Sequence, residues 1–289
     1  MGDPPVDPRL RWDVPAVGGM PHRADLEPLV TRVLAPNSSP MTLDGTNTYL
    51  VGEPGSGQVA LVDPGPDDAA HLAAVEAALA ARDARCVAVL VTHHHGDHAD
   101  AAQPWGARFG ARVAAASGRV AGPQGRVLAA GERLDVAGTR FDVVATPGHC
   151  ADHLAFRLAS GAVLVGDHVL GRGTSVVTHP EGDLLAYLES LRRVLDLGPS
   201  ALYCGHGPEL TEDPGAVLTY YLDHRAYRER QVLAAVAAGA RSVAELVAAI
   251  YADVAEQVQR AAAASTRSTL DKLAAEGRLV VAGETVRPA

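Results

Sequence analysis

The stretch Thr92-His93-His94-His95-Gly96-Asp97-His98 follows a short apolar run and decides the fold. In an extended chain His93 and His95 point to the same side, because alternate side chains of a strand share a face. Gly96 lets the backbone turn, so that the two residues after it can face the same space from the following loop. The stretch therefore delivers four potential metal ligands within six residues.

Three later strand-like runs each lead into a residue of the same type, namely His149, Asp167 and His206. Open α/β sheets hold their ligand sites outside the carboxyl ends of their strands, so these side chains can meet the histidine stretch at one edge. Neutral imidazole with carboxylate is the ligand set expected for Zn²⁺, with Mn²⁺ or Fe as substitutes. The candidate ligands, five imidazoles and two carboxylates, are His93, His95, Asp97, His98, His149, Asp167 and His206.

Seven ligands exceed the needs of one tetrahedral ion, whereas two ions that share a carboxylate fit the number. We assign the first ion to His93, His95 and His149, the second to Asp97, His98 and His206, and the bridging position to Asp167. Two zinc ions lower the pKa of a shared water toward about 7, so a metal-bridging hydroxide is the expected nucleophile. Asp97 is the candidate catalytic residue, because it could orient that hydroxide. A solvated histidine-rich turn is the alternative interpretation, and the three ligands at long range argue against it.

The other histidines are expected to lie outside the site. His94 stands between two candidate ligands, so its side chain should point the opposite way. The histidines without such neighbours are expected to be ordinary surface or helix residues, and these are His22, His71, His179 and His224.

Short apolar runs and helical patterns alternate along most of the chain. Strands are predicted over 29–34, 48–51, 59–62, 86–92, 141–146, 161–166 and 200–204, and helices over 71–84 and 184–197. Strands that alternate singly with helices after opening hairpins predict a mixed α/β sandwich. Residues 1–28 hold prolines and charges without a period, so we expect a loosely ordered N-terminal arm.

The pattern changes near Pro214, where a long helical stretch begins and runs to Gly239. Ser242 with Glu245 forms a capping box that predicts the start of a second helix. A third helix over 265–276 and a hairpin over 279–287 follow, which is the outline of a winged-helix module. The predicted domains are an arm at 1–28, a catalytic domain at 29–213 and a winged-helix-like α+β domain at 214–289.

The composition narrows the set of partners. The chain has 289 residues and a net charge of −9, which argues against generic binding of polyanions. Residues 215–289 hold nine basic and eight acidic residues, so double-stranded DNA is not an expected partner. No apolar run approaches about 18 residues and the proline-rich start is unlike an export signal, so we expect no membrane partner and a cytoplasmic location. Cys150 and Cys204 are expected to be buried free thiols.

The H-x-H-x-D-H string, together with the three later ligands, resembles the hallmark of the metallo-β-lactamase superfamily over roughly residues 29–213. The segments similar to its narrower β-lactamase-like protein 2 group, which carries a C-terminal winged-helix-like domain, are 41–52, 61–65, 146–149, 166–171, 203–208 and 221–230. The resemblance implies an αββα sandwich with a dinuclear zinc site at one edge. It also implies endoribonuclease activity on single-stranded RNA, as members of that group are described. Asp63 is expected to support the metal loops from behind.

Three functions compete at this point. The first is a phosphodiesterase, specifically an endoribonuclease on single-stranded RNA, and the second is a glyoxalase II-like thioester hydrolase, which uses the same ligand set. The third is non-enzymatic: a winged-helix binding module, whose role could also be to form a homodimer. Asp152, His153 and His168 are candidate proton donors to a leaving group. Residues 46–48 could line the substrate cleft, and Arg172 could contact an anionic substrate.

We expect purified protein to contain close to two equivalents of transition metal per chain, because the seven candidates supply the donors for two ions. Elemental analysis of the isolated protein measures this directly. A protein that holds no metal even after zinc addition would contradict the hydrolase interpretation.

Overall fold

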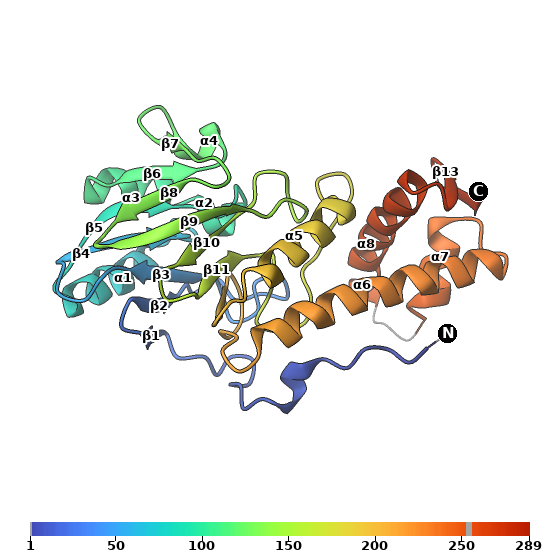
Figure 1. Cartoon of the computed structure of the whole chain (residues 1–289), viewed down its shortest axis with the longest axis horizontal. Coiled ribbons are helices and arrows are strands. Elements are labelled where there is room, and N and C mark those ends of the chain that lie inside the picture. Colours follow the sequence, from blue (N-terminus) through green and yellow to red (C-terminus); the bar gives the residue numbers. More distant parts are fainter. Residues whose placement is uncertain (1, 253–255) are drawn as a thin grey trace.

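Two β-sheets face each other, and helices cover their outer sides (Figure 1). The computed structural model describes residues 2–252 and 256–289. This arrangement confirms the predicted αββα sandwich. The first sheet is seven-stranded, in the order β1 (Arg23–Glu27), β2 (Val30–Leu34), β3 (Asn47–Val51), β4 (Gln58–Val62), β5 (Arg85–Leu90), β6 (Arg112–Ala115) and β7 (Arg126–Val127).

The second sheet sets the direction in which the later ligand loops point. It is five-stranded, in the order β12 (Leu202–Cys204), β11 (Val163–Gly166), β10 (Leu154–Leu158), β9 (Thr139–Ala145) and β8 (Arg133–Val136). Strands β11 and β12 are parallel, and β10 is antiparallel to both β9 and β11. The carboxyl ends of β9, β11 and β12 therefore lie at one edge, which is where the sequence places His149, Asp167 and His206.

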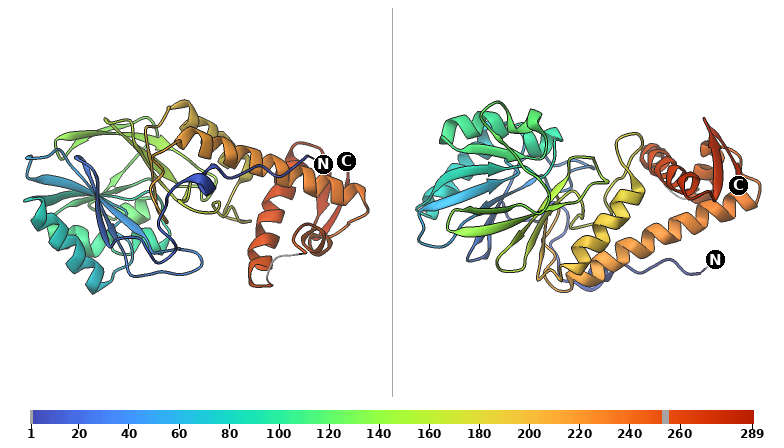
Figure 2. Two further views of the ribbon diagram at one scale, coloured as in Figure 1. Left: turned by 90° about the horizontal axis from the view of Figure 1, so that it is seen from below. Right: turned by 45° about the horizontal axis from the view of Figure 1, so that its top comes forward.

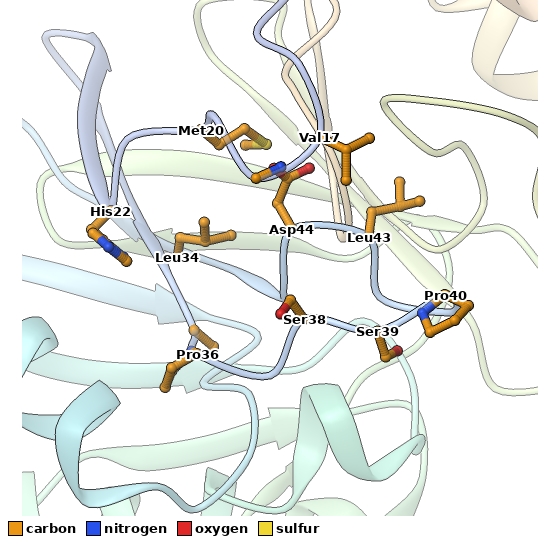
Figure 3. A pocket seen from close by; sticks show the side chains of 12 residues that line it. Val17, Met20, His22, Leu34, Pro36, Ser38, Ser39, Pro40, Leu43 and Asp44 are labelled. Atoms are coloured by element: carbon orange, nitrogen blue, oxygen red, sulfur yellow. The ribbon is translucent and has the colours of Figure 1, made fainter.

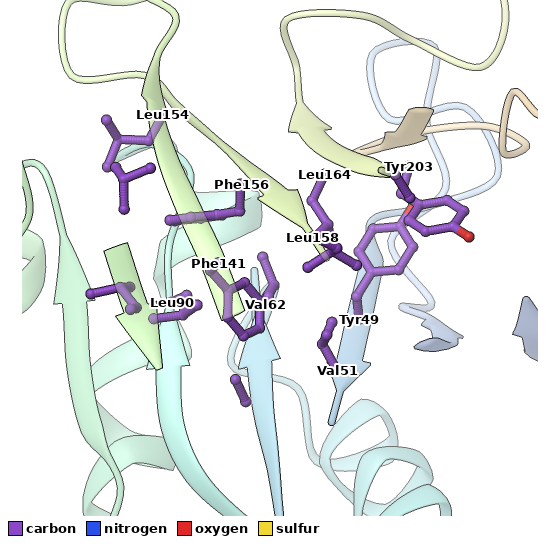
Figure 4. Close-up of a cluster of buried hydrophobic side chains, with 14 of the residues drawn as sticks. Tyr49, Val51, Val62, Leu90, Phe141, Leu154, Phe156, Leu158, Leu164 and Tyr203 are labelled. Atoms are coloured by element: carbon purple, nitrogen blue, oxygen red, sulfur yellow. The ribbon is translucent and has the colours of Figure 1, made fainter. Parts of the chain in front are cut away.

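The two sheets bury a shared apolar core (Figure 4). Tyr49 and Leu90 of the first sheet lie in one cluster with Phe141 and Phe156 of the second. The two phenylalanine rings meet edge to face, with centroids 6.4 Å apart. Burial of apolar area contributes about 25 cal/mol per Å², so this cluster is the main attraction between the sheets.

Helices close the outer faces of both sheets. The first sheet is covered by α1 (Ala69–Ala81), α2 (Gly96–Ala99), α3 (Ala102–Phe109) and α4 (Gly118–Ala121). The second sheet is covered by α5 (Leu184–Asp196), whose apolar side buries Tyr187 and Leu191. The carboxylates of Asp68 and Asp183 accept backbone N–H groups at the starts of α1 and α5, which fixes where these helices begin.

The C-terminal part is built as predicted from three helices and a hairpin. These are α6 (Pro214–Ala237), α7 (Val243–Ile250), α8 (Glu256–Ala275), β13 (Leu279–Ala282) and β14 (Thr285–Pro288). The Ser242 hydroxyl accepts the N–H of Glu245, which confirms the predicted cap of α7. Figure 2 shows that α6 extends from the sandwich to this module. In the part of the chain that the structure describes, no helix combines the length and apolarity that a membrane crossing needs.

Some predicted elements are wrong in extent. Strand β1 lies inside the segment predicted as an irregular arm, where it pairs antiparallel with β2 at the edge of the sheet. Its sequence Arg-Ala-Asp-Leu-Glu carries little apolar signal, because an edge strand buries only part of its surface. A short 3-10 helix, Pro8–Arg11, also lies in the arm. Helix α8 begins at Glu256, nine residues before the predicted 265.

His71 lies in helix α1, which agrees with one of the two expected positions, but it is buried rather than at the surface. Its side chain is 1% exposed and lies 5.4 Å from the Trp105 ring, measured between centroids. The Thr48 hydroxyl donates to the carbonyl of Asp63, so it accepts from His71 Nε2 at 2.8 Å. Burial disfavours the charged imidazolium and lowers the pKa of His71 to about 4.

This lowered pKa predicts acid sensitivity of the fold. An unfolded histidine has a pKa of about 6.5. Below that pH the unfolded chain therefore binds a proton at His71, whereas His71 stays neutral in the folded chain. The contribution of neutral His71 to the free energy of unfolding is complete above pH ~6.5 and is lost as the pH falls through about 4. The free energy of unfolding should fall between pH 7.5 and pH 4.5. We expect this fall to be about 2 kcal/mol smaller in His71→Gln than in the wild-type protein. Urea titrations at the two pH values measure it, and His22→Gln on the exposed surface, the control, should behave as wild type.

Candidate metal centre

Three histidine nitrogens converge at the end of β5 and β9. His93 Nε2 and His149 Nε2 each lie 3.0 Å from His95 Nδ1. A tetrahedral ion with Zn–N bonds of about 2.0–2.1 Å spaces its ligand atoms about 3.3 Å apart, so the three nitrogens are close to the spacing that one ion requires. The structure therefore brings together the three residues that the sequence assigns to the first ion.

A second group of donors lies beside the first. His206 Nε2 lies 3.3 Å from His98 Nε2 and 3.2 Å from an Asp97 carboxylate oxygen. These three residues are the set that the sequence assigns to the second ion. Gly205 makes the approach possible, because a Cβ at this position would lie 2.6 Å from both Asp167 Oδ1 and the His98 ring.

Asp167 lies between the two groups. Its Oδ1 is 3.3 Å from both His98 Nε2 and His206 Nε2, while Oδ2 is 3.9 Å from His149 Nε2. The Oδ1 atom is buried without a well-formed hydrogen bond, which is costly for a carboxylate oxygen unless a cation binds it. Imidazole nitrogens around a buried carboxylate are donors that suit Zn²⁺, so the residues present fit such an ion.

The outward ring nitrogens of all five histidines face oxygen atoms. The partners are Thr92 Oγ1 for His93, Glu181 Oε1 for His95, Asp63 Oδ2 for His98, the Val176 carbonyl for His149 and the Gly45 carbonyl for His206. An outward N–H that donates to such an oxygen leaves the inward nitrogen as a lone pair, which is the form that binds a metal.

Asp63 supports two of these histidines at once. Its Oδ1 accepts the backbone N–H of Thr92, and Oδ2 accepts both the Thr92 hydroxyl and His98 Nδ1. The Thr92 hydroxyl in turn lies 3.0 Å from His93 Nδ1. Asp63 has a φ of +50° at the end of β4, a conformation that aspartate tolerates better than most residues. The structure thus places Asp63 where the sequence expected it, behind the metal loops.

Charges within the centre are strongly coupled. Burial disfavours protonation of His206, but Asp167 and Asp97 outweigh it and raise the pKa of His206 to about 9. Burial and the neighbouring histidines hold the pKa of His93 well below its ordinary value. Burial opposes ionisation of Asp167, yet His206 and His98 keep its pKa well below the ordinary range. A metal cation that enters must therefore replace protons on the second group of imidazoles.

His94 points away from the centre, as predicted, and is tied to two acids. Its Nδ1 lies 2.7 Å from Asp152 and its Nε2 lies 3.0 Å from Glu181. Glu181 also faces His95, so it is a functional neighbour that the sequence did not indicate. It lies far along the chain from the histidine stretch, and no motif links the two.

The three candidate proton donors differ in exposure. Asp152 lies at the rim, where 20% of its side chain is exposed. His153 and His168 are fully enclosed, at 1% and 0% exposed. Burial lowers the pKa of His168 to about 3. Only Asp152 among the three therefore lies where a leaving group could reach it.

Residues 46–48 were predicted to line the substrate cleft, but they are buried. They stabilise neighbouring loops instead. Asn47 Nδ2 donates to the carbonyls of Cys204 and Gly207, which flank His206. Arg172 donates to the Pro15 carbonyl of the N-terminal arm. Cys150 and Cys204 are buried free thiols, as predicted.

A cavity of about 680 Å³ lies between the arm and the loop before β3 (Figure 3). It is lined by Met20, Leu34, Leu43 and Asp44 among others. Its lining includes none of the seven candidate ligands, all of which the structure describes. This cavity therefore lies apart from the metal centre, although Gly45, next to Asp44, contacts His206.

The family model for the metallo-beta-lactamase superfamily matches residues 41–206, more than half of the chain. The chain belongs to the metallo-beta-lactamase superfamily. The model for the beta-lactamase associated winged helix domain matches residues 242–286. The predicted resemblance, including the C-terminal module, is confirmed.

Similar proteins extend this assignment over most of the chain. "Beta-lactamase-like protein 2 homolog" of Drosophila melanogaster is 32% identical over 87% of this chain and 90% of its own length. "Atrochrysone carboxyl ACP thioesterase" of Aspergillus chevalieri is 33% identical over 84% of this chain and 80% of its own length. A metallo-beta-lactamase family protein from Thermus thermophilus is 27% identical, with a TM-score of 0.74 over 92% of this chain and 100% of that chain. A structure of TTHA1623 in a di-iron-bound form is 30% identical, with a TM-score of 0.50 over 66% of this chain and 97% of that chain.

We expect Asp63→Asn to weaken zinc binding by about 10- to 100-fold, which is typical for loss of the partner behind a metal-ligating histidine. The asparagine amide has only one acceptor oxygen in place of two. It cannot accept all the hydrogen bonds that Asp63 accepts from Thr92 and His98, so these residues lose their orientation. Competition with a chromophoric chelator measures the affinity. Asp213→Asn, at the start of α6, removes a carboxylate far from the centre and should leave zinc affinity unchanged.

Proposed function

We propose that this protein is a hydrolase that binds two metal ions and cleaves a thioester. The observation that carries the proposal is the position of Asp167, whose two oxygens face two separate groups of histidine donors. The proposed ligands are His93, His95 and His149 for one ion, Asp97, His98 and His206 for the other, and Asp167 for both. Zinc suits this donor set best, and iron is the alternative because one similar structure is described as di-iron-bound.

When bound, two such ions would ionise a water near neutral pH and polarise the carbonyl that it attacks. The protein itself orients the reacting groups. Asp97 is 31% exposed and directs Oδ2 toward His206, so its carboxylate can accept a hydrogen bond from a water in the centre and fix its orientation. Asp152, at the rim, can hold the proton that a departing thiol requires.

The charges beside the centre favour a substrate without a polyanionic backbone. A cavity of about 620 Å³ is lined by His94 and by Glu181, the residue that contacts the candidate ligand His95, although none of the seven candidate ligands lines it. Its lining includes the carboxylates of Asp100, Asp152 and Glu181 against the single guanidinium of Arg119. Such a lining repels phosphates and raises the cost of bringing RNA to the centre.

A thioester is further supported by the Aspergillus relative, whose name states an acyl carrier protein thioesterase. Endoribonuclease activity on single-stranded RNA, the activity first expected from the sequence, stays a prediction. The name of the Drosophila relative states no substrate. Both activities use the same metal ligands, so the choice between RNA and thioester depends on the residues that line the substrate cleft.

A side-by-side assay tests the proposal. Zinc-loaded protein is given a neutral acyl-N-acetylcysteamine thioester, an anionic glutathione thioester and an unstructured RNA, with a chelator-treated sample beside each. We expect hydrolysis of the neutral thioester to be fastest and to vanish with the metal. Cleavage of RNA without thioester hydrolysis would overturn the substrate assignment.

His95→Ala and Asp167→Ala should each lower turnover by at least about 1,000-fold, because each removes a donor from the shared centre. Circular dichroism should show unchanged helix content, since neither residue lies in a helix interior. His22→Ala, on the exposed surface, is the matched histidine control. Wild-type rates in both site variants would place the chemistry elsewhere.

A further inference from the structure

The segment 175–181 lies just before α5 and contacts α8 (Figures 1 and 2). Residues 174–178 belong to no helix or strand, so their backbone groups depend on partners from elsewhere. These partners come from two sides of the segment. One set belongs to the metal centre, and the other belongs to α6 and α8.

Three contacts connect the segment to candidate metal ligands. The Ser175 hydroxyl lies within hydrogen-bond distance of the carbonyls of Asp167, at 2.7 Å, and His168, at 3.0 Å. The Val176 carbonyl faces His149 Nδ1 at 2.7 Å. Glu181 Oε1 lies 3.3 Å from His95 Nε2. The segment thus contacts the side chains of two ligands of the first proposed ion and the backbone carbonyl of Asp167.

Three contacts connect the same segment to the C-terminal helices. Arg225 of α6 donates to the Ser175 carbonyl. Ser268 of α8 donates to the Val177 carbonyl at 3.0 Å. His179 Nδ1 lies 2.7 Å from the carboxylate of Asp271, also on α8.

Through the order of these contacts, the segment 175–181 connects the C-terminal helices to His149. The carbonyls of residues 175, 176 and 177 face, in turn, α6, the ligand His149 and α8. The two flanking hydrogen bonds thus hold the backbone on either side of the Val176 carbonyl, which leaves that carbonyl less freedom to turn away from His149. Arg225 and Ser268 are 5% and 3% exposed, so water cannot readily replace them as donors.

We propose that Ser268 and Arg225 are positioning residues for the metal centre, and that the winged-helix module orients His149 and His95 through the segment 175–181. This inference depends on the proposed metal site, and it gives the C-terminal module a role within the same hydrolase. Neither residue touches a ligand directly. Each acts through a carbonyl of the segment.

The test compares two hydroxyl deletions on α8 in the full chain. Ser268→Ala removes the donor to Val177, while Thr269→Val removes the neighbouring hydroxyl, which bonds only within its own helix at Ser265. Zinc alone is the probe, titrated against a chromophoric chelator. We expect Ser268→Ala to weaken one of two zinc equivalents roughly fivefold, the effect of one net hydrogen bond. We also expect faster amide hydrogen exchange within 175–181.

The Thr269→Val variant should retain wild-type zinc affinity and exchange, and the two variants should have similar melting temperatures. Unchanged zinc affinity and exchange in Ser268→Ala would overturn the inference, as would equal changes in both variants. If the wild-type protein binds no zinc, the proposed function fails instead. Hydrogen exchange then still decides whether Ser268 orders the segment.

Discussion

The centre depends on one electrostatic constraint, which is the carboxylate of Asp167 with its buried Oδ1 atom. Within the described part of the chain its ion-pair partners are His98, His149 and His206, with no arginine or lysine among them. An ionised carboxylate out of water needs compensating positive charge. Imidazoles supply it only when they are protonated, and a bound cation supplies it without protons.

Each of the five imidazole rings is held in its own orientation by a hydrogen-bond acceptor behind it. These acceptors come from parts of the chain far apart in sequence, including Gly45, Asp63 and Val176. The ligand loops are held as well, as Asn47 holds the loop of His206 through the carbonyls of Cys204 and Gly207. The sandwich core therefore determines the metal geometry indirectly, because it sets where the strands end and where the loops must return.

The candidate ligands and their grouping were predictable, because residue type, spacing and strand ends carry that information. The acceptors behind them were mostly not. A backbone carbonyl such as that of Val176 has no residue-type signal, and Glu181 joins His95 only through the folded loop. The burial of His71 was missed for the same reason, since it results from packing of α1 against Trp105. Asp63 was placed correctly because its motif lies directly after a strand.

The packing of α8 bears on what the winged-helix module can bind. In helix-turn-helix proteins the second helix of the pair enters the major groove, and α8 is that helix here. Yet Ser268 and Asp271 of α8 contact the segment beside the metal centre, and Leu270 and Leu273 are buried in the module's own core. Along the part of α8 whose side chains the structure describes, residues 262–275, these two sides are therefore already packed. Together with the balanced charge of residues 215–289, this packing agrees with the proposal that the module positions residues of the metal centre.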